Sequence, residues 1–146
     1  MKVAMKIDPR ETQKFKVKNF DYDPEVEGSE EYTDSIILYK PLSHLEVTRI
    51  VHSNLENGKL TPRAGEEIAD VMLHKLITGW EGFTVDDPEK EGEVKDLPFS
   101  DDLVSFIPTN IRLDFIDKVI SPMTAPLFKI DLPKGEVNEE EEEIKN

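Results

Sequence analysis

The chain contains no cysteine, which excludes disulfide bridges, thiolate metal sites and a cysteine nucleophile. It also lacks any run of about 20 apolar residues, the length that a membrane-spanning helix requires. Its first eight residues carry charges every few positions, so they lack the uninterrupted apolar stretch of a signal peptide. We therefore expect a soluble, cytoplasmic protein that does not enter a membrane.

Basic residues are scarce: the chain has 18 Lys and Arg residues and 32 Asp and Glu residues, so the formal net charge is -14. This balance disfavours nucleic acids and anionic membranes, whose phosphates require clustered positive charge. Residues 1–20 are the exception, with six basic and two acidic side chains. Two interpretations of this basic segment remain open: it lies on the acidic body, or its lysines protect an exposed strand edge from aggregation. The expected partners are proteins.

The usual signatures of catalysis and metal binding are also missing. No two of His44, His52 and His74 are one helical turn apart, as a zinc-binding helix requires. The acidic segment that begins at Asp87 follows an EF-hand calcium loop at first, but Pro98 occupies the twelfth position, where a bidentate glutamate belongs. Neither a Gly-x-Ser-x-Gly elbow nor a glycine-rich phosphate loop occurs. The sequence thus predicts a protein without catalytic residues, metal or cofactor.

Length and composition indicate one folded domain with solvated ends. A chain of 146 residues can bury one core but not two independent ones. Apolar residues make up 37% and charged residues 34%, so part of the chain should be solvated rather than packed. We predict a single globular domain over residues 1–130, with a flexible arm at 1–13. An acidic disordered tail is predicted over 131–146, because Glu139 to Glu143 are five consecutive like charges.

Two short segments have the pattern of β-strands. Lysines alternate with apolar residues from Lys14 to Phe20, which predicts a half-buried strand with Phe15 and Val17 on one face. The β-rich run Ser35–Tyr39 predicts a second strand, antiparallel to the first. With the helices that follow, the fold class predicted is α+β: a predominantly helical domain with an N-terminal antiparallel strand pair.

The first two predicted helices have clear start signals. Ser43 and Glu46 form a capping box, and that helix should end at Asn57-Gly58. Thr61-Pro62 offers a cap followed by proline in the first turn, which starts a second helix that reaches about Ile77. The short connection predicts an antiparallel pair. The apolar residues expected on their inner faces are Leu45, Ile50, Val51 and Leu55, then Ile68, Val71, Met72, Leu73 and Leu76.

The second half of the chain is predicted to hold two more helices. Residues 85–96 are too polar for a core and should form a mobile loop. Ser100 should cap a short helix that contains Leu103, Phe106 and Ile107 and is interrupted by Pro108. A fourth helix should follow from Ile111 to Ile120 and stop at Ser121-Pro122.

The only tryptophan lies between two glycines, in Gly79-Trp-Glu-Gly82, where the second helix is expected to end. Gly79 is predicted to stop the helix in a left-handed turn, after which the ring of Trp80 folds back. Trp80 and Phe83, with Phe99 and Phe106, have two interpretations. In the favoured one these aromatic rings seal the core. In the other, part of the cluster is an accessible groove for an apolar helix of a partner.

The order of three short segments resembles the tail assembly chaperones of long-tailed bacteriophages and prophages. The segments are Leu38–Ser43, Ile77–Gly82 and Leu97–Leu103, and the likeness spans residues 36–120. The basic arm, the acidic loop at 85–96 and the C-terminal tail depart from that pattern.

The resemblance implies a non-catalytic chaperone in the cytoplasm of a bacterial host. It would bind the tape measure protein until tail tube subunits polymerise around it, so both proteins are candidate partners, and self-association stays open. Under this hypothesis the partner-binding residues are Trp80, Phe83, Phe99 and Phe106. An acidic inhibitor or DNA mimic that occupies a basic protein surface is the alternative, and an enzyme comes third.

Overall fold

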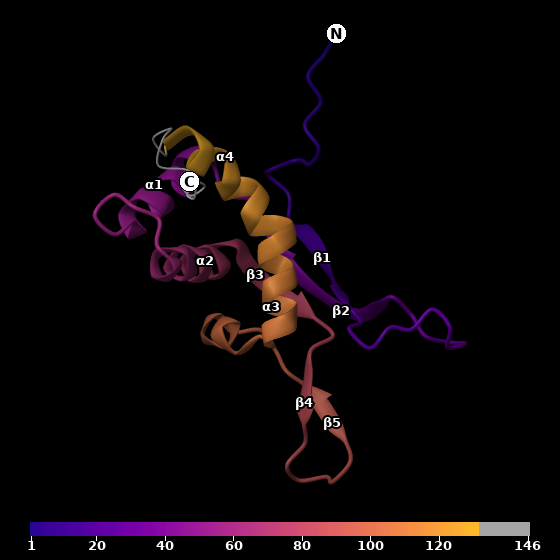
Figure 1. Ribbon diagram of the computed structural model, residues 1–146. Coiled ribbons are helices and arrows are strands. Elements are labelled where there is room, and N and C mark those ends of the chain that lie inside the picture. The colour runs from indigo at the N-terminus through magenta and orange to yellow at the C-terminus, as the bar shows by residue number, and fades with distance from the viewer. Residues whose placement is uncertain (132–146) are drawn as a thin grey trace.

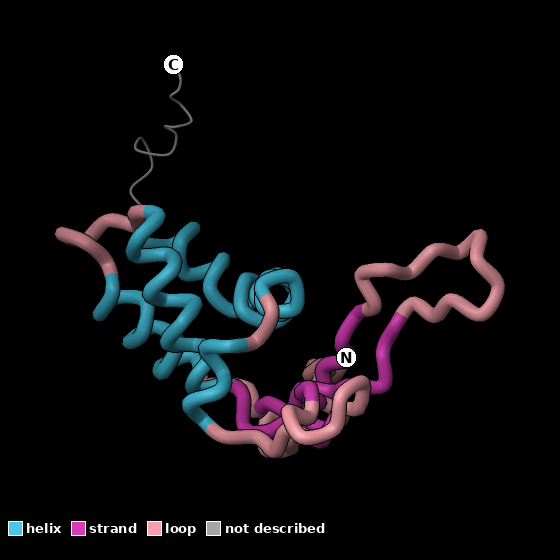
Figure 2. The backbone as a smooth tube through the Cα atoms, turned by 90° about the horizontal axis from the view of Figure 1, so that it is seen from below, coloured by secondary structure: helices cyan, strands magenta, loops and turns pink. Residues whose placement is uncertain are grey.

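In the computed structural model, helices cover one side of a small antiparallel sheet (Figures 1 and 2). The structure describes residues 1–131, so the predicted acidic tail lies outside the described residues except for Asp131, which ends the last helix. The elements are β1 (Gln13–Lys18), β2 (Tyr32–Tyr39), α1 (His44–Asn54), α2 (Pro62–Leu76), β3 (Ile77–Glu81), β4 (Thr84–Asp86), β5 (Val94–Asp96), a 3₁₀ helix (Asp101–Phe106), α3 (Thr109–Phe115), a π-helical segment (Ile116–Ile120) and α4 (Ser121–Asp131). This architecture confirms the α+β class.

The predicted strand pair is present, and it belongs to a larger sheet. β1 and β2 are antiparallel, with Phe15 opposite Ile37, and β3 pairs with the other edge of β2. Phe15 and Val17 are buried while Lys14 and Lys16 are exposed, as their alternation indicates. The sheet therefore has the order β1-β2-β3 and presents its apolar face to the helices.

The predicted left-handed helix stop at Gly79 is wrong. α2 ends at Leu76, and Ile77 is already extended, with φ -76° and ψ 121°. Gly79 lies opposite Leu38 within β3, and the positive φ in this region belongs to Gly82, at +80°. Ile77 and Thr78 are β-branched and therefore have a low helix propensity. The edge of β2 that does not pair with β1 offers backbone groups that need hydrogen-bond partners. The chain after α2 therefore continues as a strand.

The N-caps predicted for α1 and α2 are present in the structure. The Ser43 hydroxyl accepts a hydrogen bond from the amide of Glu46 at 3.1 Å, and the Thr61 hydroxyl accepts one from the amide of Ala64 at 3.0 Å. Most of the inner-face residues expected on the two helices are buried, namely Ile50, Val51, Ile68, Met72, Leu73 and Leu76, while Leu55 and Val71 are partly buried. Val47 and Ala64 are buried as well, although the sequence did not indicate them. Leu45 is exposed instead. It precedes Val47 by two residues, which is about 200° around a helix, so it faces away from the core.

Ser100 does not cap the helix that follows it, contrary to expectation. Its hydroxyl donates to the carboxylate of Asp102, and its side chain makes no cap bond. Thr61→Ala should therefore lower the free energy of unfolding by about 1 kcal/mol, whereas Ser100→Ala should change it by less than about 0.5 kcal/mol. Urea unfolding followed by circular dichroism measures both values. Equal losses in the two variants would contradict this assignment of caps.

The last helix does not stop at Ser121-Pro122. α3, the π-helical segment and α4 form one continuous helical rod that crosses the sheet (Figure 1). Pro122 is the second residue of α4, directly after the π-helical turns, where the helix is wider than an α-helix. The amide of Ser121 bonds to the carbonyl of Ile116, five residues earlier, so the α-helical hydrogen-bond pattern already changes next to Pro122, which has no N–H to donate. The rod continues past Pro122 instead of ending there.

The helical rod joins the two layers through Phe115, which is completely buried. Its ring makes edge-to-face contacts with the rings of Phe15 and Tyr39, both on the sheet. The ring centroids are 5.0 Å and 5.5 Å away, respectively. Burial raises the pKa of the Tyr39 hydroxyl, because the charged form is less well solvated there. Phe15 and Phe115 belong to a hydrophobic core that draws on the sheet and on α1, α2, α3 and α4, and Tyr39 packs against this core.

The predicted polar loop at 85–96 contains two short strands. β4 and β5 pair antiparallel, with Val85 opposite Lys95, and all six of their residues are exposed. The hairpin projects away from the body of the molecule (Figure 1). Its ladder is therefore held by backbone hydrogen bonds and not by burial.

Candidate functional site: an aromatic groove beside two acidic loops

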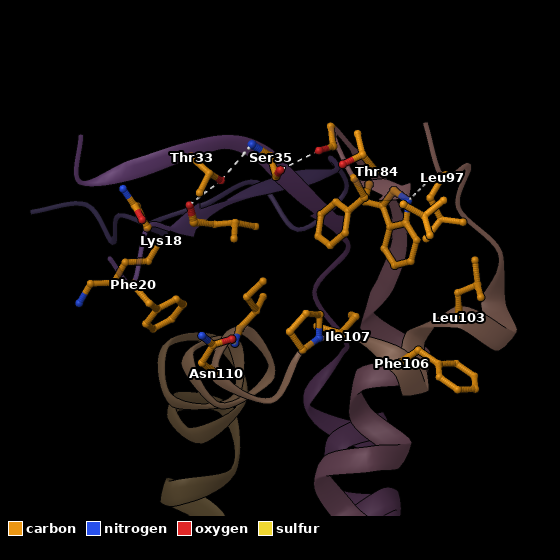
Figure 3. Close-up of a pocket in the computed structure, with 18 of the residues that line it drawn as sticks. Lys18, Phe20, Thr33, Ser35, Thr84, Leu97, Leu103, Phe106, Ile107 and Asn110 are labelled. Atoms are coloured by element: carbon orange, nitrogen blue, oxygen red, sulfur yellow. Dashed lines mark hydrogen bonds between the residues drawn. The ribbon is translucent and has the colours of Figure 1, made fainter. Parts of the chain in front are cut away.

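A pocket of about 470 Å³ opens between the end of the sheet and the segment that joins the 3₁₀ helix to α3 (Figure 3). Sheet and hairpin residues form one wall, and residues 103–111 form the other. We call it the aromatic groove, and its main apolar lining residues are Val17, Phe20, Trp80, Phe83, Phe106 and Ile107. Its size falls within the range of about 300–1,000 Å³ typical of ligand pockets.

Trp80 is held rigidly in the sheet wall of the groove. Its indole N–H donates to the carbonyl of Leu97 at 2.8 Å, so the polar atom of this half-buried ring is satisfied. The ring stacks on Phe83 with centroids 4.5 Å apart and planes 14° apart. Phe99 meets it edge-on at 5.1 Å. Three of the four predicted site residues are thus in direct contact.

The fourth predicted residue, Phe106, is on the opposite wall. It lines the aromatic groove at the end of the 3₁₀ helix and is 78% exposed. Figure 3 places it at the far side of the groove from Phe20. Phe99 does not line the groove and instead supports Trp80 at its edge. The predicted cluster is therefore part core and part accessible surface.

Phe20 is a groove residue that the sequence interpretation missed as a site. It is 45% exposed, and the ammonium group of Lys18 lies 5.9 Å from the centre of its ring. The alternating pattern placed Phe20 inside a strand, but β1 ends at Lys18. The signal that could have found it is a large apolar residue just beyond the last lysine of the alternation, next to an acidic loop.

Gly82 connects the sheet to the β4–β5 hairpin at the rim of the groove. The Ser35 hydroxyl donates to the Gly82 carbonyl at 2.8 Å. A Cβ atom on Gly82 would lie 3.1 Å from the carbonyl oxygen of Asp34 and 3.2 Å from the Cα of Ser35. Only glycine combines the positive φ at this turn with so close an approach to β2.

Two acidic loops extend away from the sheet (Figure 1). The β1–β2 loop, residues 19–31, has six acidic side chains and no basic one, and the hairpin segment 84–96 has six acidic and two basic ones. Both loops contribute lining residues, including Phe20 and Asp21 from the first and Thr84 and Val85 from the second. Lys18 is the one basic residue that lines the groove, so the charge carried by the segments around it is predominantly negative.

The residues that line the groove include no histidine and one carboxylate, Asp21. Within residues 1–131, no three or more His, Asp or Glu side chains gather in a way that could hold a metal ion. His74 lies on α2 away from the groove, with Nδ1 3.0 Å from the carbonyl of Asp70 and Nε2 3.3 Å from the Ser105 hydroxyl. What the groove offers a ligand is a set of aromatic and aliphatic surfaces.

No family model, curated protein or solved structure matches this chain. Among residues 1–131, none of the helices has the length and apolarity needed to cross a membrane.

Proposed function

We propose that the protein is a tail assembly chaperone that holds an apolar helix of a tape measure protein in the aromatic groove. The observation that carries the proposal is the contact between Trp80 and the Leu97 carbonyl. These residues belong to two of the three segments on which the family resemblance rests. Segments that are separated along the chain thus meet in one wall of one pocket, as expected if their order reflects a shared binding surface.

The exposed rings of the groove support a role in client binding. Phe20 and Phe106 keep 45% and 78% of their surface in contact with water. Large exposed aromatic side chains around a pocket are typical anchors of protein interfaces. An amphipathic helix is the partner that such grooves usually accept. The net charge of -14 would keep the chaperone and an apolar client in solution.

The test is capture of a tape measure protein by the tagged full chain after co-expression. The double variant Phe20→Ala and Phe106→Ala should lower the affinity at least about tenfold, because two interface anchors are removed. Neither side chain belongs to the buried core, so the variant should keep its fold. Titration by biolayer interferometry gives the affinity, and near-ultraviolet circular dichroism checks the fold.

Leu113→Ala is the matched control, because Leu113 is 55% exposed on α3 and does not line the groove. It should bind the client as the wild type does. If the folded double variant binds equally well, the groove is not the client site. If the wild-type chain itself captures no tape measure protein, the proposed function is wrong.

An acidic inhibitor or DNA mimic is the second candidate, favoured by the twelve acidic side chains of the two loops. Binding through these loops would weaken strongly between about 0.05 and 0.5 M salt, since exposed charges are screened over a few ångströms at high ionic strength. Binding in the aromatic groove should resist salt much better. Capture of a basic nuclease or DNA-binding protein that survives the Phe20 and Phe106 substitutions but not added salt would support this candidate.

A further inference from the structure

The first twelve residues form an arm whose apolar side chains are in water. Met1, Val3, Met5 and Ile7 are all exposed, Val3 to 95% and Met5 to 72%. They alternate with Lys2, Ala4 and Lys6, so an extended arm has one apolar face and one basic face. Exposed apolar surface of this kind costs free energy that burial against a partner would recover.

Within residues 1–131, the arm does not rest on the body of its own chain. It projects away from the domain (Figure 1). It enters the sheet at Gln13, whereas the groove begins at Val17 and continues past the other end of β1. The six-residue strand, roughly 20 Å long, lies between them. The arm of another molecule can approach the groove without folding back along this strand.

The groove and the arm have complementary chemistry. The groove offers aromatic walls to apolar side chains, and its two flanking loops carry twelve acidic side chains against two basic ones. Lys2 and Lys6 bring positive charge next to the apolar side chains of the arm. Arg10 is paired with Asp8 at 3.0 Å, so the attraction rests on the two lysines.

We propose that the N-terminal arm of one copy docks in the aromatic groove of a second copy. Alternate side chains of the extended arm enter the groove, and the lysines between them face the acidic loops. Docking buries the exposed faces of both partners at once. If the groove also holds a client helix, which rests on the proposed function, client and arm exclude each other and client binding separates the copies.

Complementation between two full-length variants tests docking without any client. The arm variant carries Val3→Ser, Met5→Ser and Ile7→Ser and keeps its groove. The groove variant carries Phe20→Ser and Phe106→Ser and keeps its arm. By sedimentation velocity, the wild type should associate as its concentration rises, and each variant alone should stay monomeric. An equimolar mixture should associate again, because one partner supplies an arm and the other a groove.

A synthetic peptide of residues 1–12 provides an optical readout. Trp80 is the only tryptophan and lies in the groove wall, so its emission reports occupancy. The peptide should change the emission of the arm variant saturably. A peptide with Lys2→Glu and Lys6→Glu should bind at least about tenfold more weakly at low salt, where charge attraction is least screened.

Several results would overturn the proposal. If the wild type stays monomeric at every concentration, the arm does not join copies. The same conclusion follows if the equimolar mixture of the two variants remains monomeric. Saturable binding of the peptide to the groove variant with unchanged affinity would place the arm elsewhere. None of these results depends on capture of a tape measure protein. A result that contradicts docking therefore does not contradict the proposed function, and the reverse also holds.

Discussion

Replacing Phe115 with alanine should lower the free energy of unfolding by about 3–5 kcal/mol, the usual cost of removing a buried phenylalanine ring. The side chain is 0% exposed and contacts the rings of Phe15 and Tyr39. Those contacts connect the helical rod to the sheet. The cavity left by the substitution lies between two rigid layers, where collapse is restricted, so we expect the upper part of that range.

Leu113→Ala is the control for Phe115→Ala, since both residues lie on α3 and Leu113 is 55% exposed. It should change the stability by less than about 0.5 kcal/mol. Urea unfolding followed by circular dichroism at 222 nm measures both variants. Comparable losses would mean that Phe115 does not connect the layers as the structure indicates.

Gly82→Ala should cost about 2–5 kcal/mol, the sum of two effects. A left-handed φ of +80° costs an alanine about 1–2 kcal/mol. The added methyl group also lies 3.1 Å from the Asp34 carbonyl oxygen, and overpacking of this kind costs about 1–3 kcal/mol. Because the neighbour is backbone, it cannot rotate away. The rim of the aromatic groove should therefore distort.

Gly92→Ala separates the two effects. Gly92 has nearly the same φ, +81°, but a Cβ atom there would meet nothing within 4 Å. This variant should lose only the conformational part, about 1–2 kcal/mol. Thermal unfolding of the two variants gives the difference, and Trp80 emission reports any change in the groove. Equal destabilisation at both glycines would show that the contact with β2 is unimportant.

The features that the sequence predicts correctly are those that depend on neighbours along the chain. Ser43 and Thr61 are recognised as caps because the groups they bind are three residues away. The alternation around Phe15 and Val17 marks a strand because one face is buried and the other is not. Such patterns are local consequences of helix and strand geometry.

The errors arise where a distant partner decides the conformation. Trp80 between two glycines has the local character of a helix stop, yet it lies opposite Ile37 in the sheet, 43 positions away. Pro122 has the local character of a terminator, but the π-helical segment before it lets the rod continue. Tertiary pairing overrode local preference at the first site and an irregular helix did so at the second.

For the candidate site, the sequence predicts the aromatic residues but not the cavity. Trp80, Phe83 and Phe99 are close along the chain, so their contact follows from one turn and one hairpin. Whether Phe106 points into the core or into water depends on how the 3₁₀ helix meets α2 and α3. Phe20 depends likewise on where β1 ends. Neither placement is encoded by a local pattern.

The position of β3 in the sheet has a consequence for the order of folding. β1 and β2 are joined by a loop alone, whereas α1 and α2 lie between β2 and β3 and bring Ile77 back beside Tyr39. That closure spans residues 40–76 and so carries a larger entropic cost than closing the shorter β1–β2 loop at residues 19–31. We therefore expect Trp80 and Gly82 to take their places after β1 and β2 have paired. A chain in which β3 has not yet paired should therefore lack the groove, because Trp80 and Gly82 are part of its lining.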